Sequence, residues 1–137
     1  MHKTAAVVVA ISALGILLVT PAFIPATQAA GEMPDKKTCG TTKNPVVSGG
    51  CLATDKAKGN CMACHNFDSL AQAGLEAGDI GPPLVAMKVR FPDKKKLRDF
   101  MWDAAKFNSN SSMPPYGRHD ILTEKEIDLL LEWLYSL

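Results

Sequence analysis

Five consecutive residues near the middle of the chain carry the clearest chemistry. Cys61-Met62-Ala63-Cys64-His65 has the form C-x-x-C-H. Two thiols three positions apart can each add to one vinyl group of the same porphyrin, and the imidazole that follows then lies over the iron. The motif therefore predicts one covalently attached haem c, with Cys61 and Cys64 as its attachment points and His65 as an iron ligand.

Two other uses of these cysteines must be weighed. A C-x-x-C pair also occurs in thioredoxin-like redox proteins, but there it follows a strand of a βαβ unit, and no such pattern surrounds Cys61. Four thiolates would suit zinc, yet Cys39 and Cys51 are too far apart to form the short C-x₂₋₄-C pair of a zinc ribbon. Haem is the interpretation that the spacing favours.

A haem that only carries electrons usually has a second axial ligand, and methionine opposite histidine raises the reduction potential. Met113 lies in a loop stiffened by Pro114 and Pro115, where a thioether can be aimed at iron with little mobility. It is the leading candidate, and His119 or an open position are the alternatives. The other methionines suit the role less well. Met62 lies in the attachment turn, Met87 closely follows the proline turn, Met101 lies on the apolar stripe of a helix, and Met33 lies in the N-terminal arm.

Helices must position these groups. A polar, irregular N-terminal arm is expected over residues 31–44. The pair Asn44-Pro45 is a typical cap and first helical residue, and predicts a helix to about Lys58. Gly49 and Gly50 weaken that helix by about 1 kcal/mol each, so they indicate either close approach of another helix or a break.

Three later segments complete the predicted helices. Residues 67–77 fit a short helix or helical turn, and a rigid turn, Gly81-Pro82-Pro83-Leu84, follows it with a carbonyl free to accept from the Nδ1–H of a ligand histidine. Asp93 begins an amphipathic helix whose apolar positions are Leu97, Phe100, Met101, Ala104 and Phe107. Its opposite face is basic, which favours a solvated face over the alternative of docking an acidic partner. Thr123 and Glu126 form a capping box that opens a final helix to the C-terminus. No strand pattern is present, so the fold class is all-α.

The N-terminus predicts export. Lys3 precedes an apolar run, Ala5 to Val19, that is shorter than the roughly 18 residues of a membrane span, and small residues follow. We expect residues 1–30 to be a signal peptide, cleaved after Ala29 to Gly31; an uncleaved membrane anchor is the alternative. Cys39 and Cys51 would then meet an oxidising compartment, where a disulfide is the default and two separate thiols are the alternative.

Composition limits the partners. The chain has 137 residues and a net charge of +1, and Lys3 is the only charged residue of the expected signal, so the exported chain is neutral. This balance favours neither nucleic acid nor a membrane surface. Removal of residues 1–30 leaves enough chain for one domain and too little for two, and residues 45–137 are expected to form it. A domain this small gains much of its core from a bound macrocycle.

Several motifs together resemble a known family. The C-x-x-C-H motif, the Gly81–Leu84 turn, Met113-Pro114-Pro115 and a terminal helix with Trp133 and Tyr135 look like class I c-type cytochromes. More narrowly, the chain resembles the SoxX family, whose members are the monohaem subunits of the SoxAX cytochromes of periplasmic sulfur oxidation. The segments that carry this resemblance are Gly59–His65, Arg90–Lys94, Trp102-Asp103, Met113–His119 and Ile121–Thr123.

The resemblance implies a class I cytochrome c-like fold of three to four helices around one haem. It implies that His65 and Met113 ligate the iron, that Pro82 offers its carbonyl to His65, and that Leu84 contacts the haem. It also implies a SoxA-like partner that carries the active site of an L-cysteine S-thiosulfotransferase, joining thiosulfate to a cysteine of the carrier SoxYZ. The chain itself would be a non-catalytic electron-transfer subunit in the periplasm that passes electrons to a downstream c-type cytochrome.

Two alternatives share the same haem. A free-standing periplasmic cytochrome shuttle would show a charged rim and make transient contacts, whereas a permanent subunit would expose an apolar surface when isolated. A haem sensor or peroxidase-like enzyme would need an exchangeable position on the iron.

Overall fold

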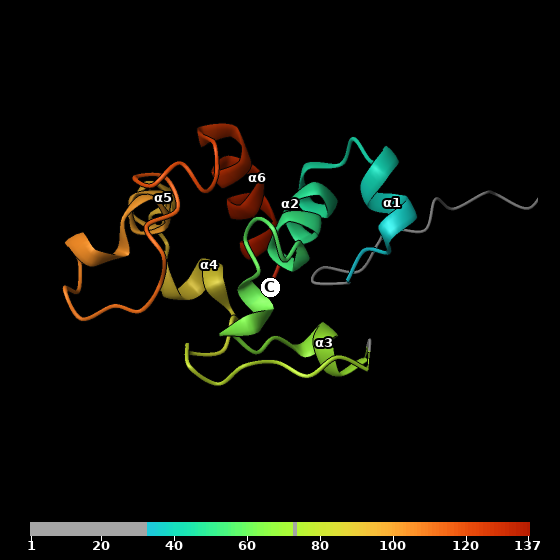
Figure 1. The fold of residues 1–137 in the computed structure, drawn as a ribbon, viewed down its shortest axis with the longest axis horizontal. Coiled ribbons are helices and arrows are strands. Elements are labelled where there is room, and N and C mark those ends of the chain that lie inside the picture. The colour runs from blue at the N-terminus through green and yellow to red at the C-terminus, as the bar shows by residue number, and fades with distance from the viewer. Residues whose placement is uncertain (1–32, 73) are drawn as a thin grey trace, which may run out of the picture.

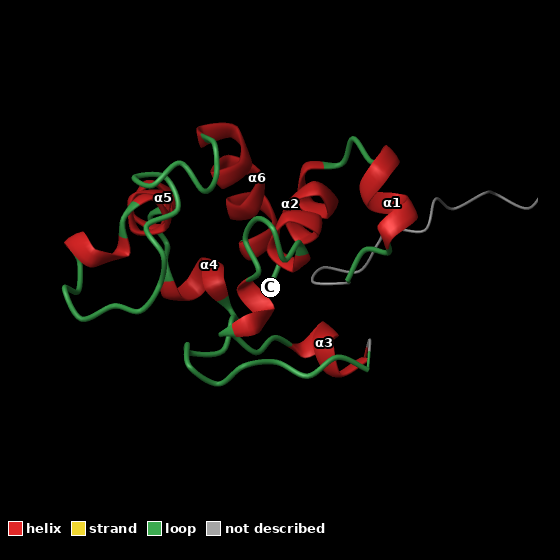
Figure 2. Ribbon diagram, in the orientation of Figure 1, coloured by secondary structure: helices red, strands yellow, loops and turns green. Residues whose placement is uncertain are grey.

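The computed structural model describes residues 33–72 and 74–137, and this part of the chain is helical, with no strand (Figures 1 and 2). The predicted all-α class is confirmed. The α-helices are α1 (Lys36–Thr41), α2 (Pro45–Thr54), α3 (Asp68–Gln72), α4 (Met87–Arg90), α5 (Lys94–Trp102) and α6 (Glu124–Leu134), and the two 3₁₀ turns are η1 (Cys61–Ala63) and η2 (Ala104–Lys106). The expected three to four helices are too few: the described residues form six α-helices, because the short helices α1 and α4 have no apolar period that the sequence pattern could reveal.

The two longest helices, α2 and α6, pack directly on each other, and α6 lies between α2 and α5 (Figure 1). A Cβ atom added to Gly49 would lie 2.1 Å from the carbonyl oxygen of Leu129, and one added to Gly50 would lie 3.2 Å from the Trp133 ring. Of the two explanations for the paired glycines, close approach of another helix is therefore confirmed, because α2 continues through both without a break.

Helix ends follow local side-chain chemistry. Asn44 accepts hydrogen bonds from the backbone N–H groups of Val46 and Val47, as its predicted role as a cap requires. The helix ends at Thr54 rather than near Lys58, because Asp55 adopts an extended conformation and its side chain accepts from the N–H of Ala57 in a turn.

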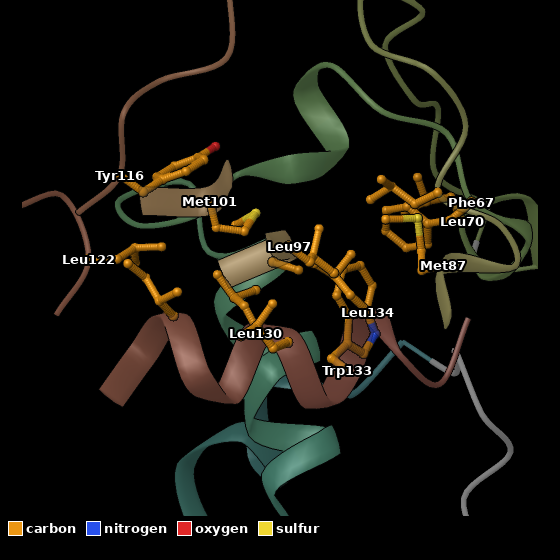
Figure 3. Packing of buried hydrophobic residues seen from close by; sticks show 14 residues of the cluster. Phe67, Leu70, Met87, Leu97, Met101, Tyr116, Leu122, Leu130, Trp133 and Leu134 are labelled. Carbon is orange, nitrogen blue, oxygen red and sulfur yellow. The ribbon is translucent and has the colours of Figure 1, made fainter. Parts of the chain in front are cut away.

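The capping box of α6 is present as predicted. The side chains of Thr123 and Glu126 each bind the backbone N–H of the other residue. The helix ends at Leu134, three residues before the predicted end. Figure 3 shows its buried side chains beside those of α5 and of the Phe67 segment. The rings of Phe67 and Trp133 meet edge to face, with 5.1 Å between their centres.

The helix that Asp93 caps, α5, ends at Trp102, so the expected apolar stripe is only partly helical. Leu97 and Met101 are buried, whereas Phe107 lies beyond the helix and is 47% exposed. The basic face is not simply solvated: Arg98 pairs with Glu124 and Asp128 of α6, and Lys94 pairs with Glu132. These contacts join α5 to α6 along their outer edges.

The expectation of an irregular N-terminal arm is wrong for six residues. Lys36–Thr41 forms α1, because Asp35 caps it by accepting from the N–H of Thr38 at 2.8 Å. The helix buries no residue of its own. A disulfide between Cys39 and Cys51 ties α1 to α2, which confirms the predicted pairing.

The expected signal peptide, residues 1–30, lies outside the described residues, and its cleavage stays a prediction. Among the helices that the structure describes, none has the length and apolar character needed to cross a bilayer.

Candidate haem-attachment site

The C-x-x-C-H motif folds as one tight turn. Asn60 takes a left-handed conformation (φ 46°), and the chain then enters η1, in which the N–H groups of Cys64 and His65 donate to the carbonyl of Cys61. Side chains at positions i and i+3 of a 3₁₀ turn eclipse each other. The turn thus places the thiols of Cys61 and Cys64 on one side, and neither takes part in a disulfide.

The electrostatics of the turn disfavour a redox dithiol. Burial raises the pKa of the Cys61 thiol to about 12, and the neighbouring Cys64 adds to the effect. Catalytic C-x-x-C motifs instead lower the pKa of one cysteine so that it is a thiolate at neutral pH. The zinc alternative fails for a different reason, since the disulfide consumes Cys39 and Cys51, and no group of three potential ligands gathers within the described residues.

The imidazole of His65 is held in one orientation. Its Nδ1 lies 2.7 Å from the carbonyl oxygen of Pro82. A carbonyl can only accept, so Nδ1 carries the proton and the lone pair of the neutral ring is on Nε2. The contact predicted between His65 and the proline turn is present, and Nε2 is the atom left for a metal.

Gly81 lies directly against this ring. A Cβ atom at Gly81 would come within 2.3 to 2.8 Å of Cε1, Nδ1 and Nε2 of His65. Any side chain there would push the imidazole out of place. The glycine of the Gly-Pro-Pro-Leu turn is therefore a steric requirement of the histidine orientation, which composition alone did not reveal.

Residues 78–84 run beside the attachment turn and are bonded to it through the backbone. The N–H groups of Gly78, Gly81 and Leu84 donate to the carbonyls of Met62, Cys64 and Asn66, at 3.0, 2.7 and 2.7 Å. The Leu84 side chain is buried in the core cluster. Three backbone bonds and the bond to His65 thus join residues 78–84 to the attachment turn, from which they are separated in sequence.

Met113 is half-buried and packs against the core cluster, as Cys61 and Met62 also do. Its loop is tied to the attachment segment by Tyr116, whose hydroxyl donates to the carbonyl of Gly59 at 2.8 Å across 57 residues. Gly59 lies two positions before Cys61. The tertiary fold therefore fastens the loop that carries Met113 to the segment that opens the C-x-x-C-H motif.

The same loop has a second anchor on α5. The N–H groups of Gly117 and Arg118 both donate to the carbonyl of Trp102, and Nε of Arg118 lies 2.9 Å from Oδ2 of the buried Asp103. Sequence reasoning missed Tyr116, Asp103 and Arg118 as anchors. The only signal was an aromatic residue and an arginine directly after Met113-Pro114-Pro115.

The remaining candidate ligands have other surroundings. Met101 and Met87 are each 4% exposed and belong to the core cluster, so the interpretation of Met101 as core is confirmed. Met33 also packs against the cluster rather than hanging free. His119 is exposed. Met113 is thus the candidate that combines partial burial with a doubly anchored loop.

The sequence matches no protein-family model, and no curated protein or solved structure is similar to it. The residues of the motif nevertheless fit a covalently held haem: two thiols share one side of a turn, and an adjacent imidazole has its Nε2 lone pair free and its ring seated on a glycine.

Proposed function

We propose that this chain is an exported monohaem c-type cytochrome that carries electrons, with a class I cytochrome c-like fold. Cys61 and Cys64 would hold the haem as thioethers, and His65 and Met113 would ligate its iron. The single observation that carries the proposal is the 2.7 Å contact between Nδ1 of His65 and the Pro82 carbonyl within an intact C-x-x-C-H turn. Metal-bound histidines usually have such an acceptor on the other ring nitrogen.

Three residues of the proline turn would support the haem ligand His65. The bound haem supplies one-electron transfer at its iron. Pro82 fixes the tautomer of His65, Gly81 fixes its ring plane, and Leu84 adds apolar packing beside the turn. Rigid ligand placement keeps the geometry similar in both oxidation states, which favours fast electron exchange over ligand binding.

We further propose that the chain is a SoxX-like subunit of a periplasmic SoxAX-type complex. The support is the set of motifs from Gly59 to Thr123 and two exposed apolar side chains on either side of the proline turn in sequence, Ile80 and Val89, which are 71% and 80% exposed. A lasting partner is expected to cover such residues. In this role the chain would accept electrons released when a SoxA-like partner joins thiosulfate to the SoxYZ cysteine, and would pass them to a downstream c-type cytochrome.

The haem assignment is tested by expressing the full chain in a bacterial host that matures c-type cytochromes. We expect an exported red protein whose pigment resists extraction by acidified acetone, and the double variant Cys61→Ala/Cys64→Ala should lose the pigment. Met113→Ala should abolish the weak sulfur-to-iron absorption of the oxidised protein and lower the potential, whereas Met101→Leu should leave that absorption in place. A colourless wild-type protein would refute the proposal.

The partner assignment is tested by purifying the chain from its native periplasm. We expect it to co-purify with a SoxA-like cytochrome and to be reduced when thiosulfate and SoxYZ are added. Recovery of the chain alone would favour the free-standing shuttle. Ready binding of carbon monoxide to the reduced protein at neutral pH would instead favour a sensor or peroxidase-like role.

A further inference from the structure

The proline turn beside His65 has a second donor, which the proposed function does not use. Nη1 of Arg90, the last residue of α4, donates to the carbonyl oxygen of Pro83 at 2.7 Å. The same nitrogen lies 3.6 Å from the sulfur of Met87. Pro82 and Pro83 therefore present neighbouring carbonyls to two different donors, an imidazole and a guanidinium.

The two carbonyls are mechanically coupled. Each proline ring locks its φ angle near −65°, so few soft torsions separate the carbonyl of Pro82 from that of Pro83. The N–H of Leu84 is bonded to the carbonyl of Asn66, which fixes the far end of the turn. A donor that holds the Pro83 carbonyl therefore restricts the direction of the Pro82 carbonyl as well.

We propose that Arg90 is a positioning residue for the iron ligand: by holding the carbonyl of Pro83, it keeps the carbonyl of Pro82 aimed at Nδ1 of His65. The inference rests on the proposed function, and it adds a control on the iron potential. A firm bond from Nδ1–H raises the basicity of the imidazole, which stabilises the oxidised iron. Loosening that bond therefore raises the potential.

Lys88 offers a matched control. It lies on the same short helix, is exposed like Arg90, and makes no hydrogen bond or ion pair within the described residues. Arg90→Gln and Lys88→Gln each remove one positive charge from α4, and only the first removes a donor from the turn. Loss of a nearby positive charge alone lowers the potential, so the two mechanisms have opposite signs.

The experiment uses the mature haem protein in its reduced state. Hydrogen exchange of the His65 Nδ1 proton is followed by NMR, and the midpoint potential is measured by redox titration. We expect Arg90→Gln to exchange that proton about tenfold faster, the factor that corresponds to loss of one charge-assisted hydrogen bond. We also expect its potential to be higher than that of Lys88→Gln. If Arg90→Gln yields too little folded protein, Arg90→Lys is compared with Lys88→Arg, because both changes keep the positive charge, and only Arg90→Lys should speed the exchange.

Equal exchange rates and equal potentials in Arg90→Gln and Lys88→Gln would overturn the inference while leaving the haem assignment intact. Faster exchange by the same factor in both variants would also overturn the inference, because Lys88 makes no hydrogen bond to the turn within the described residues. A wild-type chain without covalent haem would instead refute the proposed function, before any variant is compared.

Discussion

Replacing Tyr116 by Phe removes one oxygen atom and tests whether the loop of Met113 is held by its contact with Gly59. The hydroxyl is buried and donates to a buried residue at 2.8 Å. Its loss leaves the Gly59 carbonyl without a donor, which costs about 2 kcal/mol of stability in a buried setting. For a domain of this size, that corresponds to a fall of about 10 °C in Tm.

Tyr135 provides the matched control. It also donates to a backbone carbonyl, that of Phe91 at 2.6 Å, but it is only partly buried and its acceptor lies outside the segments of Gly59 and Met113. Tyr135→Phe should cost about 1 kcal/mol, because water replaces part of the lost bond. Both variants should melt earlier than the wild type.

The assay compares global melting, by far-UV circular dichroism, with loss of the sulfur-to-iron absorption in the oxidised protein. In Tyr116→Phe the absorption should vanish at a lower temperature than the helices melt, because the loop is released first. In Tyr135→Phe the two transitions should coincide. The reasoning is refuted if both variants behave alike, or if Tyr116→Phe melts as the wild type does.

Tyr116 also predicts a pH dependence. Burial raises the pKa of its phenol above the ordinary value. Below about pH 10 the phenol is protonated in both the folded and the unfolded chain, so its contribution to the free energy of unfolding does not change with pH. Above that pH only the unfolded state deprotonates, and the free energy of unfolding falls by up to about 1.4 kcal/mol per pH unit. Urea unfolding between pH 9 and 11 should show a steeper decline for the wild type than for Tyr116→Phe.

Two further predictions concern the scaffold. Gly49→Ala should lower the free energy of unfolding by about 1–3 kcal/mol, because the new methyl group would overlap the backbone of α6. Gly40→Ala is the control: its methyl group would meet nothing within 4 Å, so the free energy of unfolding should stay equal or rise slightly. Chemical denaturation measures both values, and similar values would contradict the packing argument. The double change Cys39→Ser/Cys51→Ser should lower the free energy of unfolding by about 3 kcal/mol, because the unfolded chain is then no longer restricted by a cross-link. If neither this change nor added reductant alters the melting curve, α1 lies outside the cooperative unit.

Several features were predictable because their causes are local in sequence. Side-chain caps begin helices through bonds to N–H groups two or three residues on, and this is how α2, α5 and α6 start at Asn44, Asp93 and Thr123. The bonds that close the turn of Cys61 to His65 are local as well, since the N–H groups of Cys64 and His65 donate to the carbonyl of Cys61 directly after the left-handed Asn60. Helix ends were less predictable, since α2 and α5 end where Asp55 and Asp103 leave the helical conformation, and the apolar period does not mark either position.

By itself, the sequence determined the all-α class and the thiol pair with its histidine, because both follow from residue type and short spacing. It also predicted the pairing of Cys39 with Cys51, because these are the two cysteines left over in a chain expected to be exported to an oxidising compartment. Only the tertiary structure decided which helix the glycines of α2 meet and which groups hold the loop of Met113 and the turn of Pro82. Those contacts join residues as far apart as Gly59 and Tyr116. No local rule specifies such a pair, since its formation depends on where the packed core of α2, α5 and α6 brings two otherwise unrelated loops.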